Sequence, residues 1–129
     1  MAKIIAHGID LVDFERIEQM LNRHQERFCE RVFTARELAD AEKVKNRIEK
    51  LAGRFAAKEA VMKLIGTGWR DGVAWTDIEV VNNEVGQPMV TVCGKVKELA
   101  EQKHIEQITI SITHTANFAI ASAVALQGG

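Results

Sequence analysis

The sequence contains little cysteine and few aromatic residues, and it has no long hydrophobic run. The two cysteines, Cys29 and Cys93, show neither metal-ligand spacing nor a disulfide pattern, so we expect a reducing, cytoplasmic setting. Without a run of about 18 apolar residues, no segment is expected to span a membrane. The first apolar stretch meets Asp10 and Asp13 too early for a signal peptide, and we expect none.

Aromatic residues make up only 5% of the chain, and the net charge is −1. The charge is nevertheless uneven. Residues 16–63 hold 12 Lys and Arg against 8 Asp and Glu, a net charge of +4, whereas the remainder holds 5 against 10, a net charge of −5. A locally basic segment favours an anionic ligand or partner. We do not expect that partner to be nucleic acid, because the patch is modest, aromatic residues are few and no recognition motif is present.

The composition is that of a globular protein. Hydrophobic residues make up 47% and charged residues 27% of the 129 residues, and there is no repeat, low-complexity tract or linker, so we expect one domain over residues 1–129. The periodicities predict elements in the order β-α-α-α-β-β-α-β-β. This order is typical of an α+β fold in which an antiparallel sheet packs on a long buried helix.

Five strands are predicted, at residues 4–12, 77–82, 89–93, 105–113 and 118–126. Four helices are predicted, from Phe14 into the twenties, from Ala35 to about Val44, from Leu51 to the glycines at 66–68, and over 95–103. Residues 43–50 are polar and basic and are expected to form a surface connection. The strand at 118–126 is apolar throughout, so we expect it to be buried on both faces.

The helix at 51–68 is apolar or small on nearly all sides, yet it carries four charges: Arg54, Lys58, Glu59 and Lys63. Charges on a buried helix destabilise it unless they are paired or used. Glu59 and Lys63 lie one turn apart on a face lined by alanines, which leaves room for a ligand. The same spacing equally fits an i,i+4 salt bridge.

Two further features involve charged residues. Asp10 is a carboxylate inside an otherwise apolar strand, where either a metal ion or a role as a capping aspartate would explain it. Arg16, Arg23 and Arg27 fall on one stripe of the first helix, provided that the helix stays regular past Asn22. This stripe is either a solvated basic face or a docking strip for an acidic protein or for phosphates.

His114 stands at a strand end, three residues after Ser111. A lone histidine is usually structural. The Ser-x-x-His order does not indicate nucleophilic catalysis, because no acidic orienting residue or oxyanion-hole motif is nearby in the sequence.

Four separated motifs stand out together. They are Gly8-Ile9-Asp10, FAAKEAVMK at 55–63 with Gly66-Thr67-Gly68, Asn83-x-x-Gly86-x-Pro88, and SITHT at 111–115 followed by an alanine-rich strand. This combination resembles the 4′-phosphopantetheinyl transferases, specifically the short bacterial holo-[acyl-carrier-protein] synthases, over nearly the whole chain. The resemblance implies Mg²⁺-dependent transfer of 4′-phosphopantetheine from coenzyme A to a serine of apo-acyl carrier protein, in support of fatty acid biosynthesis. The other product would be adenosine 3′,5′-bisphosphate.

The resemblance also implies a role for individual residues. Asp10 and Glu59 match metal-binding carboxylates, and Glu59 also matches the residue proposed to activate the serine hydroxyl. Lys63 would stabilise the charge on the leaving phosphate. Residues expected to contact coenzyme A are Arg54, His114, Gly66, Lys45 and Arg47. Residues expected to meet the acyl carrier protein are Arg16, Arg23 and Arg27.

Relatives in this family are homotrimers with active sites between subunits, and the resemblance implies the same here. His7 stands where small or apolar residues are more usual, and its role is left open. Two alternatives also remain open from the residues alone. One is another small coenzyme A-using enzyme, such as a thioesterase without a metal, and the other is a non-enzymatic oligomeric module that binds an acidic protein.

Overall fold

The computed structural model describes residues 2–66, 68–69 and 72–128. The elements are β1 (Lys3–Asp13), α1 (Phe14–Val32), α2 (Ala35–Glu42), α3 (Arg47–Ile65), the short 3-10 helix η1 (Trp75–Asp77), β2 (Ile78–Asn82), β3 (Pro88–Val92), α4 (Gly94–Gln102), β4 (Gln107–His114) and β5 (Phe118–Gln127). The predicted α+β class and element order are confirmed. In the described part of the chain, no helix is both long enough and apolar enough to cross a membrane.

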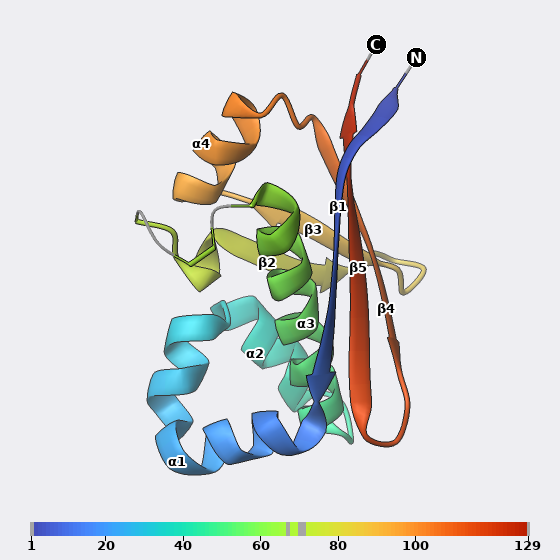
Figure 1. Cartoon of the computed structure of the whole chain (residues 1–129). Helices are drawn as coiled ribbons and strands as arrows, with labels where there is room; N and C mark the ends of the chain where they lie inside the picture. Colours follow the sequence, from blue (N-terminus) through green and yellow to red (C-terminus); the bar gives the residue numbers. More distant parts are fainter. Residues whose placement is uncertain (1, 67, 70–71, 129) are drawn as a thin grey trace.

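The five strands divide into two antiparallel sheets rather than one. β1, β5 and β4 form a three-stranded sheet with β5 in the centre, and β2 pairs with β3 in a hairpin. Figure 1 shows the helices on one face of the three-stranded sheet, with α3 lying along it. The long buried helix laid on a sheet is therefore present as predicted.

Small residues bring α3 and the sheet very close together. The inner face of β5 consists of four fully buried alanines: Ala119, Ala121, Ala123 and Ala125. On β1, a Cβ atom added to Gly8 would collide with the carbonyl oxygen of Ala60 in α3, so only glycine fits there. Because side chains alternate along a strand, Asp10 lies on the same inner face as Gly8.

Helix α3 begins at Arg47, so the prediction that residues 43–50 form a surface connection is wrong for 47–50. The Asn46 side chain caps the helix by accepting a hydrogen bond from the Glu49 backbone N–H at 3.1 Å. A capped polar first turn has no apolar periodicity, and for this reason the sequence favoured a loop. Gly66 ends the helix with a φ of +88°, a left-handed conformation that favours glycine.

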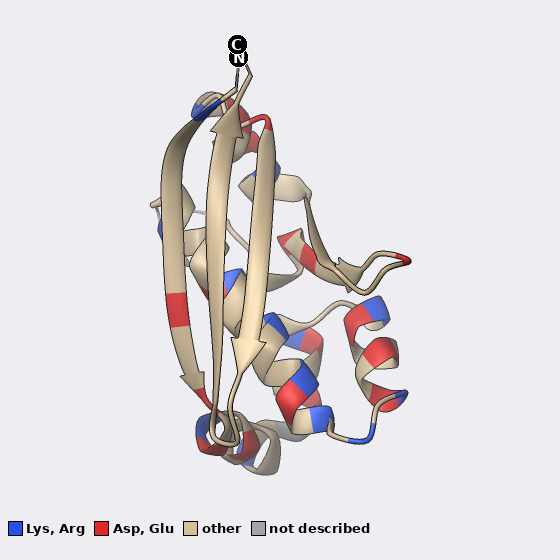
Figure 2. Cartoon of the chain, turned by 90° about the vertical axis from the view of Figure 1, so that its right-hand side faces the viewer, with Lys and Arg blue, Asp and Glu red and all other residues tan. Residues whose placement is uncertain are grey.

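The outer face of the three-stranded sheet is exposed and apolar along β1, and it is polar but uncharged along the middle of β4. Ile9 and Leu11 of β1 are 58% and 57% exposed, and His7 is exposed on the same face. The expectation that β5 is buried on both faces holds only for its inner face, since the outer face is half-buried. Figure 2 shows this sheet nearly free of charged residues, which gather on the helices behind it.

A buried ion pair anchors the middle of α3. Lys58 Nζ lies 2.7 Å from Glu37 Oε1, and both side chains are fully buried. The same ammonium donates to the carbonyl oxygens of Val32 at 2.8 Å and of Ile78 at 2.6 Å. Glu37 Oε2 accepts from the Val80 backbone N–H at 2.7 Å. Burial lowers the pKa of Lys58, while the charge of Glu37 acts in the opposite direction. This pair therefore ties α1, α2, α3 and β2 together.

Replacing Lys58 by Met should lower the free energy of unfolding by about 3–5 kcal/mol, because the Glu37 carboxylate would stay buried without its partner. Urea denaturation followed by circular dichroism measures this change. The control is Lys97→Met on the exposed side of α4, which should change the stability by less than about 0.5 kcal/mol. A loss below about 1 kcal/mol in Lys58→Met would contradict the anchoring role.

Candidate functional site

Helix α3 carries charged side chains on two of its flanks. Arg54 and Glu59 are separated by five positions, which places them roughly 140° apart around the helix axis. The flank that holds Glu59 meets the edge strand β1, whereas the flank that holds Arg54 meets β4 and the β2–β3 hairpin. The predicted site residues of α3 therefore belong to two separate clusters, one acidic and one cationic.

The acidic cluster joins β1 to α3. Lys63 donates from its Nζ to Asp10 Oδ1 at 2.9 Å and to the Ile9 carbonyl oxygen at 3.0 Å. Glu59 Oε1 accepts a hydrogen bond from the Trp69 indole N–H at 3.0 Å. Within the described residues no salt bridge joins Glu59 to Lys63, because Lys63 pairs with Asp10 across the helix–sheet contact. The i,i+4 pair that the sequence left open is thus replaced by a pair between two elements.

The two carboxylates of this cluster influence each other. Partial burial raises the pKa of Glu59, and the negative charge of Asp10 raises it further. The Trp69 hydrogen bond and the positive charges of Arg16 and Lys63 oppose this rise. The Asp10 side chain is 13% exposed, and its Oδ2 is buried with no hydrogen-bond partner in the described part of the molecule. Such an orphaned carboxylate oxygen is a free ligand for a cation.

The donors of the acidic cluster suit a hard divalent cation. Mg²⁺ is usually held by one or two carboxylates together with substrate phosphates and water. Asp10 Oδ2 lacks a partner, and Glu59 has a second oxygen besides the one that Trp69 contacts. Among the described residues there is no group of three or more His, Cys, Asp or Glu side chains that could enclose a metal ion. The residues therefore fit a cation that shares its coordination with a phosphate ligand.

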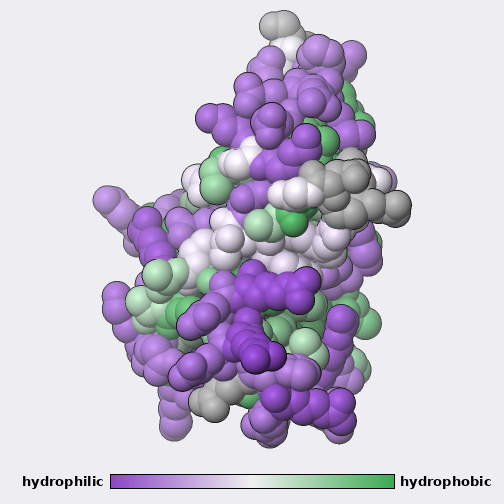
Figure 3. All heavy atoms as spheres, turned by 90° about the vertical axis from the view of Figure 1, so that its left-hand side faces the viewer, coloured by the Kyte–Doolittle hydropathy of each residue, from purple (hydrophilic) through white to green (hydrophobic). Residues whose placement is uncertain are grey.

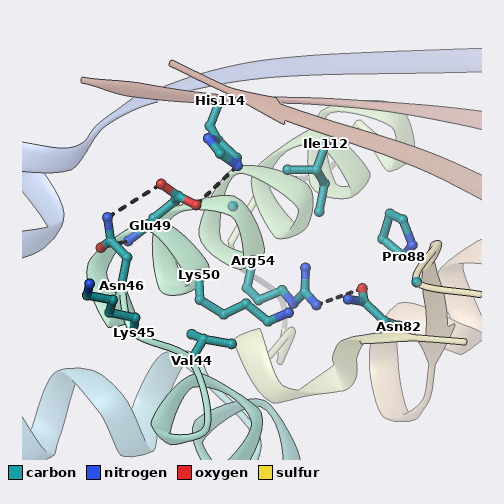
Figure 4. A pocket seen from close by; sticks show the side chains of 12 residues that line it. Val44, Lys45, Asn46, Glu49, Lys50, Arg54, Asn82, Pro88, Ile112 and His114 are labelled. Carbon is teal, nitrogen blue, oxygen red and sulfur yellow. Dashed lines mark hydrogen bonds and ion pairs between the residues drawn. The ribbon is translucent and has the colours of Figure 1, made fainter. Parts of the chain in front are cut away.

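The cationic cluster lines a cavity of about 510 Å³ between the start of α3, the end of β4 and the β2–β3 hairpin. Figure 4 shows Lys50 and Arg54 from α3 and His114 from β4 around this space. Lys45 also lines it, and Glu49 is the one carboxylate among the described lining residues. The cavity is therefore suited to an anion.

Arg54 is the most informative residue of this cavity. Its side chain is buried, donates to Asn82 Oδ1 at 2.9 Å, and forms no ion pair with any described residue. Burial lowers the pKa of Arg54, and the charges of Glu37 and Asp40 act in the opposite direction. Burial and the charge of Arg54 also lower the pKa of Lys50, which Asp40 opposes. Two neighbouring cations held in this way favour the binding of a negatively charged group.

Glu49 and His114 meet on one side of the cavity, with His114 Nε2 3.1 Å from Glu49 Oε1 (Figure 4). The Asn46 side-chain amide donates to Glu49 Oε2 at 3.4 Å. These contacts connect the first turn of α3 to the end of β4 and hold the imidazole against the cavity.

Arg16 of α1 lies near the acidic cluster, where its charge acts on Glu59, and does not line the cavity. Arg16 and Arg27 line a depression of about 410 Å³ that also contains Phe55 and Trp75. The Arg16 guanidinium lies 5.3 Å from the centre of the Phe55 ring. Arg23 is exposed and does not line this depression. On the side that carries α1 and η1, hydrophilic residues surround a paler, more apolar band (Figure 3).

Comparison with known proteins assigns the chain to a family. The family model of the 4′-phosphopantetheinyl transferase superfamily matches residues 6–123. The holo-[acyl-carrier-protein] synthase of Solibacter usitatus is 42% identical over 94% of this chain and 97% of that protein. This chain belongs to the holo-[acyl-carrier-protein] synthase family. The synthase of Neisseria meningitidis is similar in structure, with a TM-score of 0.87 and 28% identity over 95% of this chain and 98% of that one.

A further synthase structure, that of Helicobacter pylori in complex with coenzyme A, has a TM-score of 0.81 and 31% identity over 92% of this chain and 98% of that one. The resemblance found in the sequence is therefore confirmed, and the protein is an enzyme of the synthase family. The alternatives of a thioesterase-like enzyme and of a non-enzymatic module are set aside.

The cavity does not contain every residue that the synthase resemblance assigned to coenzyme A. The assigned residues that line it are Lys45, Arg54 and His114. Arg47 points elsewhere, with its Nε 2.8 Å from Glu42 Oε1 and its Nη2 3.7 Å from Cys29 Sγ. Gly66 caps α3 and does not line the cavity.

Three side chains at the two clusters escaped the sequence analysis: Glu49, Lys50 and Trp69. Lys50 lies four residues before Arg54, so a helix that began earlier would have placed both on one face. Glu49 lies in the same first turn, for which the Asn46 cap is a local signal. Trp69 lies in a loop without periodicity, and no local pattern connects it to Glu59.

Glu59→Gln should raise the midpoint of thermal unfolding at pH 8. The raised pKa means that folding disfavours the charged carboxylate, so this cost is present above the folded-state pKa and vanishes below the ordinary value of about 4.3. The difference between variant and wild type should therefore shrink as the pH falls toward 4. Glu98→Gln on the exposed side of α4 is the control. A variant that is less stable than wild type at pH 8 would contradict the assignment.

Proposed function

We propose that this protein transfers the 4′-phosphopantetheine group from coenzyme A to a serine hydroxyl of apo-acyl carrier protein and releases adenosine 3′,5′-bisphosphate. The observation that carries the proposal is the arrangement of charges on α3. The buried Arg54 faces a cavity, and on another flank Glu59 faces β1, where Asp10 has a carboxylate oxygen without a hydrogen-bond partner among the described residues. One such cluster suits phosphates and the other suits the metal ion that phosphoryl transfer needs.

Coenzyme A is proposed to bind in the cationic cavity. Its volume of about 510 Å³ lies within the range of small-molecule sites. Arg54 and Lys50 would pair with phosphate oxygens, which would relieve the unpaired buried charge. His114, held by Glu49, would border the ligand in the same cavity. The relative from Helicobacter pylori was solved with coenzyme A, which supports the same ligand here.

Asp10 and Glu59 are proposed to hold Mg²⁺. When bound, the ion supplies a Lewis acid that draws negative charge from the pyrophosphate. Lys63, whose ammonium already contacts Asp10, would donate to the phosphate that departs. Glu59 would take the proton of the serine hydroxyl, directly or through water.

The two clusters are proposed to complete one another across a subunit boundary. Asp10 lies on the edge strand β1 and His114 on the opposite edge strand β4, with β5 between them, so they are roughly 10 Å apart across the sheet. Helix α3 also lies between the carboxylates and the cavity of its own chain. A closed ring in which the β1 edge of one subunit meets the β4 edge of the next would bring the acidic cluster of one subunit to the cationic cavity of its neighbour.

A homotrimer of this kind would also cover the apolar residues of β1 on the outer face of the sheet. Ile9 and Leu11 are more than half exposed in the single chain, and this face is nearly free of charge (Figure 2). His7 would then lie between subunits. Contacts of this composition are typical of permanent interfaces.

The acyl carrier protein is proposed to dock on α1, through Arg16, Arg23 and Arg27. Arg16 supports this proposal, because its positive charge acts on Glu59 and opposes the rise in the pKa of that carboxyl. An acidic carrier bound to α1 would thus present its serine near Glu59. With this activity we also propose a cytoplasmic role in fatty acid biosynthesis.

Incubation of the protein with coenzyme A, Mg²⁺ and apo-acyl carrier protein should add one phosphopantetheine group to the carrier, as measured by mass spectrometry of the intact protein. A chelator should abolish the gain, and Arg54→Gln should reduce it strongly while leaving the circular dichroism spectrum unchanged. Lys97→Gln, far from both clusters on α4, is the matched control. An unmodified carrier, under conditions in which a known synthase modifies it, would overturn the proposed function.

A further inference from the structure

Trp69 connects the acidic cluster to a stack of aromatic rings. Its indole lies 3.7 Å from the Trp75 ring, centre to centre, at an angle of 18°. Trp75 in turn stacks on Phe55 of α3, with centres 5.0 Å apart and an angle of 25°. The Arg16 guanidinium covers the other end of this stack. The position and plane of the Trp69 ring are therefore fixed by its neighbours and not only by its own loop.

The stack directs one polar atom of Trp69 toward the Glu59 carboxylate. An indole has a single hydrogen-bond donor, the Nε1–H, and in Trp69 this donor contacts Glu59 Oε1 at 3.0 Å. Because the ring is held on its face, the bond fixes the orientation of the carboxylate. The second oxygen, Oε2, has no hydrogen-bond donor among the described residues and remains available to a ligand.

Packing alone does not explain this contact. A phenylalanine would stack on Trp75 as well as a tryptophan does, but it would leave Glu59 Oε1 without a donor on that side. The carboxylate has no salt bridge to Lys63 in the described part of the chain, since Lys63 is committed to Asp10. Among the described residues, Trp69 therefore supplies the side-chain hydrogen bond that Glu59 accepts.

We propose that Trp69 is a positioning residue, whose indole N–H holds Glu59 so that its free oxygen is ready to bind a divalent cation together with Asp10 Oδ2. This inference rests on the proposed function, in which that cation is Mg²⁺. Hydrogen bonds to ligating carboxylates typically raise metal affinity by orienting the ligand before the ion arrives. Competition is not expected, because the indole uses one oxygen and the metal can use the other.

The test is a titration with Mn²⁺, a paramagnetic substitute for Mg²⁺ whose free form is counted by electron paramagnetic resonance, at saturating coenzyme A. Trp69→Phe keeps the stacked ring and removes the donor, so the dissociation constant for Mn²⁺ should rise about tenfold. The dissociation constant for coenzyme A, measured by calorimetry in the absence of a divalent cation, should stay unchanged. Trp69→His, which keeps a ring N–H, should restore part of the metal affinity and is the second variant should Trp69→Phe not fold.

Trp75→Phe is the matched control. It replaces the neighbouring ring but leaves the Trp69 donor, so its Mn²⁺ affinity should lie within about twofold of wild type. The chain has two tryptophans, so Trp69 is then the sole indole, and its fluorescence should change when Mg²⁺ binds.

The possible outcomes separate this inference from the proposed function. Unchanged or tighter Mn²⁺ binding in Trp69→Phe would overturn the positioning role while leaving the metal site intact. A loss of coenzyme A affinity in parallel would reduce Trp69 to a structural residue and also overturn it. Absence of Mn²⁺ binding in the wild type would refute the proposed metal site itself, and the inference would fall with it.

Discussion

The close packing of helix α3 against the three-stranded sheet is the contact on which the rest of the structure depends. Gly8 lets β1 approach the backbone of Ala60, and the alanines of β5 keep the helix equally near the centre of the sheet. Because the layers are so close, Asp10 on β1 reaches Lys63 on α3. A larger residue at position 8 would separate the layers and with them the acidic cluster.

A helix packed in this way can carry a charge in the core only when that charge is paired, and α3 carries further charges on both of its flanks. The Lys58–Glu37 pair sits inside the core and is fully satisfied, so it serves the fold. Arg54 is also buried but has no carboxylate partner among the described residues, so its charge is left for a ligand. Glu59 lies on the remaining flank, with its orientation set by Trp69. Charged residues close together on one helix thus have different roles, and the contacts of each side chain determine its role.

The sequence predicted what depends on local pattern and on family motifs. It predicted the α+β class, the order of elements and the unusual charges of α3. It could not decide whether Lys63 pairs with Glu59 or with another residue. The partner of Lys63 comes from β1, and a contact between distant segments leaves no local signal in the sequence. It placed the start of α3 at Leu51 rather than Arg47, because a capped polar turn resembles a loop. The contact of Trp69 with Glu59 depends on the stacking of rings from three segments, which periodicity does not encode.

Mixing two inactive variants tests whether the carboxylates of one chain act with the cationic cavity of another, as we propose. Glu59→Gln disables the metal half, and Arg54→Gln disables the phosphate half. Co-expressed and purified as mixed assemblies, the two should recover transfer to the carrier, because some interfaces then join two intact halves. Mixed assemblies that remain inactive, although both variants are folded and associated, would show that each chain uses its own two clusters.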